Sequence, residues 1–396
     1  MNMKTLGAIF LISGTSIGAG MLALSVVTAA YGFMWATVLF VATWAYLTYT
    51  AFLILETTLW LPKETNMISM AKLTLGKPGL AVAWFSYLLL MYSLLAAYMT
   101  GLGGLTVAVI NQYCHTVLPV WFGALIFIGV FGFVIYLGVK FVDGLNRIFV
   151  IGLIITYVTL LFILAPHVAI EHLKYQAVSH LWLAVPVVVT SFGFHVVIPG
   201  LRSYLNSDVK QLRLAIFVGS TVPLLVYILW ELIVIGVIPL HGANGLMAIG
   251  KTGQPQIYLA QAFASMTHTL WIGKGFTWFA FFAMGTSLLG VAFSLFDFLA
   301  DGFDIEKTHF GKLATALITF IPPFVFAIFY PKGFIMALSY AGIWIAVLLG
   351  ALPACMVWWG RYRKQIAFGY QTIGGKIALV LVMVLSILVV IAQLAA

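Results

Sequence analysis

Long apolar runs separated by short polar stretches fill the chain from end to end. A helix that spans a bilayer needs about 20 apolar residues, and the pattern predicts eleven such spans. We place them at residues 5–30, 33–59, 80–110, 121–138, 147–165, 181–204, 211–239, 271–299, 312–330, 333–357 and 375–395. The pattern therefore predicts an all-α polytopic membrane protein without room for a sizeable soluble domain.

Two of these runs contain residues that suit a lipid-facing helix poorly. Ser13–Leu24 reads SGTSIGAGMLAL in the first span, and Thr190–Gly200 reads TSFGFHVVIPG in the sixth. Gly- or Pro-interrupted segments at matching positions of two halves are typical of inverted-repeat transporters. We therefore expect helices 1 and 6 to be broken mid-membrane. The expected repeats cover residues 1–165 and 166–357, and an additional helix lies within 358–396.

A broken helix frees backbone amides and carbonyls that lipid cannot satisfy, so they must line a protein or water-filled cavity. The amide end of a half-helix favours a carboxylate, and the freed carbonyls accept hydrogen bonds from an ammonium group. This chemistry fits an amino acid held by Thr15, Gly18, Ala19, Gly20 and Ser191. Close helix packing by small residues is the alternative. The G-x-S-x-G pattern at residues 14–18 also occurs in hydrolases, but that motif needs a strand-to-helix turn.

Composition and charge support a membrane protein. Hydrophobic residues make up 63% of the chain and charged residues 7%, with a net charge of +9. With the N-terminus cytoplasmic and the C-terminus periplasmic, all basic residues except Lys174, Lys251, Lys274 and Lys332 fall on the inner side, as the positive-inside rule requires. The charge then indicates topology and contact with anionic lipids rather than nucleic acid. Metalloprotease, Cys/His and Walker motifs are absent from the sequence, so we expect neither an enzyme nor a cofactor.

Several segments, taken in order, resemble the hydroxy/aromatic amino acid permease family, and most closely its tyrosine-specific bacterial members. They are GTSIGAGMLAL, LLE ending at Glu56, TSFGFH with Pro199, TSLLGVAFSLFDFLAD from Thr286 to Asp301, ITFIPP to Pro323, and FYPKGFIMALSYAG from Phe329 to Gly342. The resemblance implies a LeuT-like fold and uptake of aromatic amino acids with protons across the bacterial inner membrane. Ser25 stands where the helix-1 motif normally ends in proline. Leu153 stands where many members carry a helix-5 lysine after the Asn-Arg pair.

Aromatic and polar side chains near the two breaks are the candidates for substrate contact. Four residues are expected to face the aromatic ring of the substrate, since rings favour offset or edge-on partners: Phe192, Phe194, Tyr92 and Tyr98. Tyr98 resembles, by helix position, the helix-3 tyrosine that meets the substrate carboxylate in this fold. His195 is a candidate for a substrate hydroxyl, with a satisfied buried histidine as the alternative.

Carboxylates and hydroxyls within the spans are candidates for ion coupling or gating. Glu56 and Asp297 lie toward the inner ends of helices 2 and 8, where an interfacial ion pair is the alternative. Glu231 lies deeper in helix 7 and is a candidate proton carrier, with a carboxylate that faces a water-filled vestibule as the alternative. A possible sodium site has its oxygen ligands in Gly14, Ile17, Thr286 and Ser287, and sodium stays a rival to the proton because a helix-5 amine that can take its place is missing here. Hydrogen bonding between helices is the alternative for Thr286 and Ser287.

The sequence thus predicts a secondary active transporter that imports aromatic amino acids, with L-tyrosine favoured, by ion-coupled alternating access. A proton is the favoured coupling ion and sodium is the alternative. A membrane sensor that binds an amino acid without moving it is the alternative of another class. The oligomeric state stays open.

Overall fold

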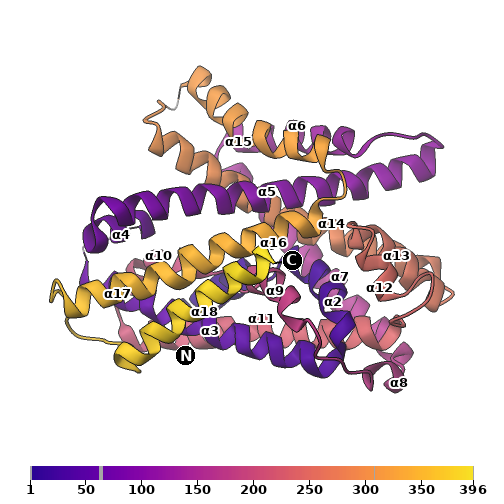
Figure 1. Ribbon diagram of the computed structural model, residues 1–396. Coiled ribbons are helices and arrows are strands. Elements are labelled where there is room, and N and C mark those ends of the chain that lie inside the picture. The colour runs from indigo at the N-terminus through magenta and orange to yellow at the C-terminus, as the bar shows by residue number, and fades with distance from the viewer. Residues whose placement is uncertain (1, 62–65, 307, 396) are drawn as a thin grey trace.

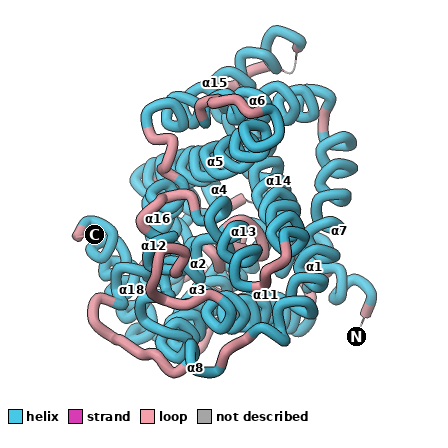
Figure 2. Tube along the Cα trace, turned by 90° about the vertical axis from the view of Figure 1, so that its right-hand side faces the viewer, coloured by secondary structure: helices cyan, strands magenta, loops and turns pink. Residues whose placement is uncertain are grey.

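The computed structural model describes residues 2–61, 66–306 and 308–395. Within these ranges, every regular element is a helix (Figure 2), which confirms the all-α prediction. Lys63 and Lys307, two of the basic residues assigned to the inner side, lie outside the described residues.

The first half of the chain forms α1 (Met3–Ser16), α2 (Gly20–Thr28), α3 (Gly32–Trp60), α4 (Met67–Leu75), α5 (Lys77–Cys114), α6 (Val120–Leu137), α7 (Val139–Leu164) and α8 (Ile170–Leu173). The second half forms α9 (Val185–Thr190), α10 (Ile198–Tyr204), α11 (Val209–Val237), α12 (Leu246–Gly250), α13 (Pro255–Met266), α14 (Leu270–Gly302), α15 (His309–Phe329), α16 (Phe334–Ile345), α17 (Leu352–Tyr362) and α18 (Gly375–Leu394). Short helical turns connect some of them: η1 (Ala29–Tyr31), η2 (Ala165–His167), η3 (Leu181–Ala184), η4 (His195–Val197) and η5 (Ala346–Ala351), the last of which is a π-helix.

Ten helical stretches of the described chain are long and apolar enough to cross a membrane. This measure counts Gly20–Trp60 as one stretch, and α1 falls short because it ends after 14 residues. The predicted number of eleven spans is therefore not confirmed by length and composition, although the multi-pass character is.

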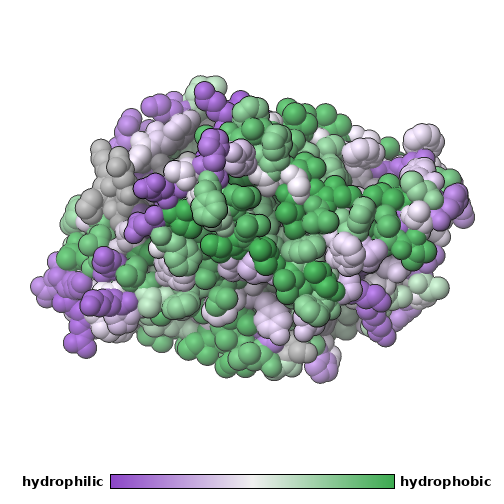
Figure 3. Space-filling view, turned by 90° about the horizontal axis from the view of Figure 1, so that it is seen from above, coloured by the Kyte–Doolittle hydropathy of each residue, from purple (hydrophilic) through white to green (hydrophobic). Residues whose placement is uncertain are grey.

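The long helices run between two polar ends of the molecule, and hydrophobic surface covers the part between these ends. On the face shown in Figure 3, hydrophilic residues gather at the left and right ends and hydrophobic residues cover the middle. Figure 1 places α4 and the α17–α18 connection at one end, and α8 and α13 at the other. This separation fits an arrangement in which the long helices span the bilayer.

The core lies where α2, α5, α9, α11 and α14 meet, and the largest fully buried side chains there include Trp230 and Phe279. α5 crosses the bundle with α6 and α15 on one side and α16 on the other (Figure 1). Outer helices instead expose apolar side chains, such as Phe133 on α6 and Ile377 on α18. Lipid tails can cover these exposed apolar faces. Only the inner helices therefore need to pack closely against other helices on all sides.

Candidate functional site

The first helix is interrupted between α1 and α2. The α-helix ends at Ser16, Ile17 takes an extended conformation with φ −74° and ψ 114°, and helical structure resumes at Gly20. The amide of Ala19 donates to Ser287 Oγ on α14 at 3.1 Å. Among the described residues, the amides of Gly18 and Gly20 donate no hydrogen bond. The predicted break in helix 1 is confirmed, and it leaves the amides of buried Gly18 and half-buried Gly20 as donors of the kind that a carboxylate accepts from.

The sixth span is also interrupted, between α9 and η4. α9 ends at Thr190, and the next helical turn starts at His195. Thr190 stabilises the end of α9, because its hydroxyl lies 2.8 Å from Pro186 O and 3.1 Å from Leu338 O on α16. The predicted break in helix 6 is thus confirmed as well.

The two breaks lie side by side. A β-carbon at Gly20 would lie 2.6 Å from Ser191 Oγ and 3.4 Å from Ser191 Cα, so only glycine allows this approach. The hydroxyl of Tyr227 on α11 lies 2.6 Å from Ser16 O and 2.9 Å from Ser191 O. One phenol therefore connects a carbonyl from each break. Sequence analysis missed Tyr227, although its place four residues before Glu231 put it on the same face of that helix.

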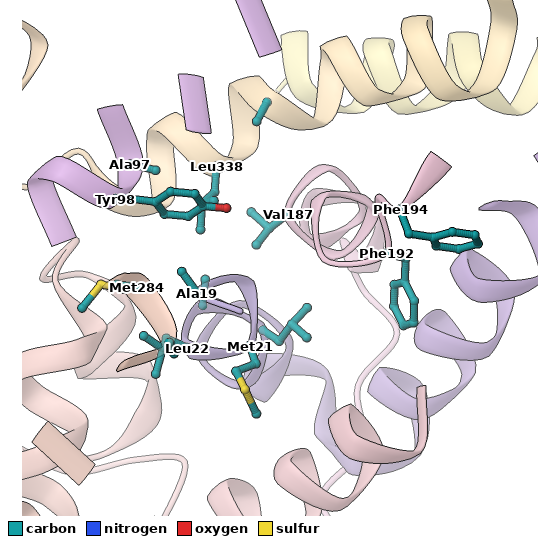
Figure 4. Close-up of a cluster of buried hydrophobic side chains, with 14 of the residues drawn as sticks. Ala19, Met21, Leu22, Ala97, Tyr98, Val187, Phe192, Phe194, Met284 and Leu338 are labelled. Carbon is teal, nitrogen blue, oxygen red and sulfur yellow. The ribbon is translucent and has the colours of Figure 1, made fainter. Parts of the chain in front are cut away.

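Tyr98 on α5 faces the first break from the opposite side. Figure 4 shows its ring pointing into the region bordered by Ala19 and Val187, and its phenol is the neighbour of Ser287. Other side chains around this region are apolar: Leu22, Ala97, Met284 and Leu338. The structure therefore brings Gly18, Ala19, Gly20, Ser191 and Tyr98 together and adds Ser287 to the group.

The two phenylalanines of helix 6 do not join Tyr98. Figure 4 shows Phe192 and Phe194 pointing away from Tyr98, on the far side of α9. Phe192 packs edge-on against Tyr227 with ring centroids 5.2 Å apart, and Phe194 lies beside His195 at 5.0 Å. Both are buried. This placement corrects the expected arrangement, because an unwound segment does not follow the helical angle from which the direction of a side chain is inferred.

Three other predicted contacts also lie elsewhere. Tyr92 donates to Ile318 O on α15 at 2.9 Å. Thr15 is exposed, and its hydroxyl donates to Leu11 O on its own helix at 2.7 Å. His195 is fully buried, with Nε2 2.8 Å from Thr50 Oγ1 on α3. This bond matches the alternative expectation of a buried histidine, although Nδ1 has no partner.

The proposed sodium ligands are partly engaged in other bonds. Thr286 Oγ1 lies 2.5 Å from Asn146 Oδ1 on α7, two turns before Leu153. Ser287 donates to Ala283 O at 2.9 Å while it accepts from Ala19. Gly14 is exposed, and a β-carbon there would meet no atom within 4 Å. Thr286 thus bonds to α7, and Ser287 bonds to α14 and to Ala19, the residue before α2. A cation would instead need both hydroxyl oxygens to converge on one point.

The three candidate carboxylates have different surroundings. Glu56 is fully buried and forms a two-pronged ion pair with Arg361 on α17, with N–O distances of 2.6 and 2.5 Å. This matches the ion-pair alternative. Asp297 on α14 is half-buried and faces Tyr87 on α5. Glu231 is fully buried on α11, and its Oε1 lies 2.5 Å from Thr28 Oγ1 on α2.

Comparison with known proteins identifies the family. Residues 1–393 match the tryptophan/tyrosine permease family. The chain belongs to this family. It is similar to two proteins of Haemophilus influenzae, tyrosine-specific transport system 1 (35% identical) and tyrosine-specific transport system 2 (34% identical), and each alignment covers 98% of this chain and 95% of the relative. These relatives are transport systems, so this permease is a transporter and not an enzyme.

A solved structure supports the fold of this permease. The crystal structure of MhsT in complex with L-phenylalanine superposes with a TM-score of 0.70 at 14% identity, and the match covers 99% of this chain and 98% of MhsT. MhsT has the LeuT fold, and the likeness confirms the LeuT-like fold expected from the sequence. The division into two repeats, at residues 1–165 and 166–357, stays a prediction.

Proposed function

We propose that this permease is a secondary active transporter that imports aromatic amino acids, with L-tyrosine as the favoured substrate. The observation that carries this proposal is the pair of adjacent helix breaks with the unpaired amides of Gly18 and Gly20. These amides suit the substrate carboxylate, and freed carbonyls suit its ammonium group. The tyrosine-specific relatives support the choice of substrate.

The side chain of the substrate would lie on the Tyr98 side of the breaks. Leu22, Val187 and Met284 supply apolar surface in that region, and burial of an aromatic ring against apolar groups is favourable. The Tyr98 phenol supplies a polar atom near Ser287. Binding between two half-helices then allows access to alternate by motion of one helical bundle against the rest.

We further propose that a proton drives the transport. A fully buried carboxyl at Glu231 supports this choice, since ionisable groups inside a membrane are characteristic of proton relays. Sodium is the second candidate coupling ion, and the existing bonds of Thr286 and Ser287 weigh against it. In this proposal, the protein lies in the bacterial inner membrane with a cytoplasmic N-terminus and a periplasmic C-terminus.

Uptake of radiolabelled tyrosine into proteoliposomes tests the function. We expect accumulation when a proton gradient is imposed, and equal uptake with sodium or potassium in the buffer. The Tyr98→Phe variant should lower uptake about fivefold, the value of one net hydrogen bond, whereas Tyr92→Phe should not. Absence of tyrosine, tryptophan and phenylalanine counterflow would refute the proposal and favour a binding-only sensor.

The two cysteines allow a test of the orientation. Cys114 at the end of α5 is exposed, whereas Cys355 lies within α17. We expect a membrane-impermeant maleimide to label Cys114 in spheroplasts, and the Cys114→Ser variant to lose this label. Labelling of Cys114 in inverted vesicles alone would reverse the proposed topology.

A further inference from the structure

Glu231 lies in a small polar cluster that the substrate site does not use. It is 0% exposed, as are Ser25 and Thr28 on the facing helix α2. Glu231 Oε1 lies 2.5 Å from Thr28 Oγ1. Glu231 Oε2 and Ser25 Oγ are both buried and have no hydrogen-bond partner among the described residues, and Ser25 is a neighbour of the same carboxyl. Buried polar atoms are rarely left unpaired without a reason.

In the part of the chain that the structure describes, no basic side chain pairs with this carboxyl. Ion pairs of the described residues join Arg147 to Asp143, Lys174 to Glu171 and Arg361 to Glu56. The elements packed against α11 are α1, α2, α3, α7 and α8 and the turn η2, and Trp230 on α11 also contacts rings of α13 and α14. Their titratable groups are Tyr157, His167, Glu171, His172, Tyr258 and Lys274 toward the outer half of α11, and Lys4, Tyr46, Tyr49, Glu56, Lys140, Asp143, Arg147, Asp297 and Asp301 toward its inner half. Tyr227 lies one turn before Glu231 on α11 itself.

Hydrogen-bond directions depend on the charge of Glu231. Thr28 Oγ1 carries one proton and lies 2.7 Å from Leu24 O, which can only accept. If Glu231 is protonated, its O–H donates to Thr28, and Thr28 donates to Leu24. If Glu231 is ionised, the Thr28 proton turns to the carboxylate and the bond to Leu24 is lost. The neutral acid therefore satisfies one more hydrogen bond of α2 than the anion does.

Ser25 adds to this arrangement. Its hydroxyl is free to donate to Glu231 Oε2, the oxygen that Thr28 does not reach. A proline at this position, as in the motif that the helix-1 segment resembles, would carry no hydroxyl. Both hydroxyls belong to α2, which begins at Gly20 directly after the helix-1 break. The charge of the Glu231 carboxyl thus affects the hydrogen bonds of α2, the half-helix that borders the candidate substrate site.

We propose that Ser25, Thr28 and Glu231 form the proton-binding site of this transporter, and that the bound proton lets Thr28 bond to Glu231 on α11 and to Leu24 within α2 at the same time. A proton taken from the outer side adds to Glu231 Oε1, and the same proton leaves to the inner side after the substrate is released. Loss of the proton breaks the Thr28–Leu24 bond within α2 and leaves a buried charge between α2 and α11, which favours movement of the outer half-helix toward water. This inference rests on the proposed proton-coupled transport.

The Glu231→Gln variant tests the proposal in proteoliposomes. Glutamine keeps the shape and a donor but cannot exchange a proton. We expect counterflow of labelled tyrosine to persist, while an imposed proton gradient no longer raises the internal concentration above the external one. Tyrosine-induced proton influx, followed with a pH-sensitive dye, should disappear. Proton-driven accumulation equal to that of the wild type would overturn the proposal.

Thr28→Val provides the second test, because Glu231→Gln can also impair folding. We expect proton-driven accumulation by Thr28→Val to fall roughly two- to tenfold relative to its counterflow, as one hydrogen bond is lost. Thr57→Val is the matched control, since Thr57 is 0% exposed and donates to Leu53 O on its own helix at 2.9 Å. If the ratio of proton-driven accumulation to counterflow is the same in Thr28→Val and Thr57→Val, the proposal is overturned.

Transport by the wild-type protein distinguishes failure of the proposed proton site from failure of the proposed transport function. Counterflow of tyrosine with accumulation driven by sodium and not by protons would overturn the proton site and leave the transporter proposal intact. Absence of counterflow of any aromatic amino acid would refute the proposed function itself.

Discussion

Replacing Glu56 by glutamine is expected to destabilise the inner ends of α3 and α17. Glu56 is 0% exposed and the Arg361 side chain is 7% exposed. Arg361 donates from two nitrogens, and the Thr372 amide donates to Glu56 Oε2 at 2.7 Å. Removing one partner of a buried pair costs about 3–5 kcal/mol, because the other charge stays buried without compensation. We expect the lower end of this range, since glutamine still accepts one of these bonds.

The loss can be converted into a shift of the thermal midpoint. An unfolding entropy of about 2.1 cal/mol/K per residue, taken over 396 residues, gives roughly 0.8 kcal/mol/K. A loss of about 3 kcal/mol then lowers the midpoint by roughly 4 °C. The shift is larger if helices persist in the detergent-unfolded state, because the entropy of unfolding is then smaller. Tryptophan fluorescence of the detergent-solubilised protein during heating measures this shift.

Two further variants make this test decisive. Asp143→Asn removes an exposed i, i+4 pair with Arg147, whose side chains are 55% and 74% exposed, and should shift the midpoint by less than about 1 °C. The double variant Glu56→Leu with Arg361→Met removes both buried charges and should recover most of the loss. An unchanged thermal midpoint in Glu56→Gln would refute the reasoning. A midpoint in the double variant that falls further than in Glu56→Gln would refute it as well.

Two predictions concern the contact between the helix breaks. Tyr227→Phe removes the phenol that joins carbonyls of both breaks and should lower tyrosine uptake at least about fivefold. Tyr157→Phe, which removes a phenol bonded to Val226 O at 2.9 Å, should retain most uptake, and equal losses would contradict this assignment. Gly20→Ala should abolish uptake by forcing a β-carbon against Ser191, whereas Gly14→Ala meets open space and should be tolerated. Uptake assays with expression controls check both pairs, and normal transport by Gly20→Ala would contradict the close approach.

Much of the membrane architecture follows from the sequence because it depends on local composition. Long apolar runs mark the spans, and glycine, serine and proline in mid-span mark the breaks, since lipid penalises unpaired backbone groups wherever they occur. Ser13–Leu24 and Thr190–Gly200 were located in this way, and the structure confirms a break in each. The same reasoning placed Gly18, Ala19, Gly20 and Ser191 at the candidate site.

Partners of individual side chains required the tertiary structure. Glu56 pairs with Arg361, 305 residues away, and Thr28 meets Glu231 at a separation of 203 residues. Phe192 and Phe194 point away from Tyr98 because the unwound segment between α9 and η4 sets their direction. Sequence by itself determined the class of protein, the breaks and the residues near them. Which polar groups meet was decided by helix packing, since the rotation of each helix depends on its neighbours and not on its own sequence period.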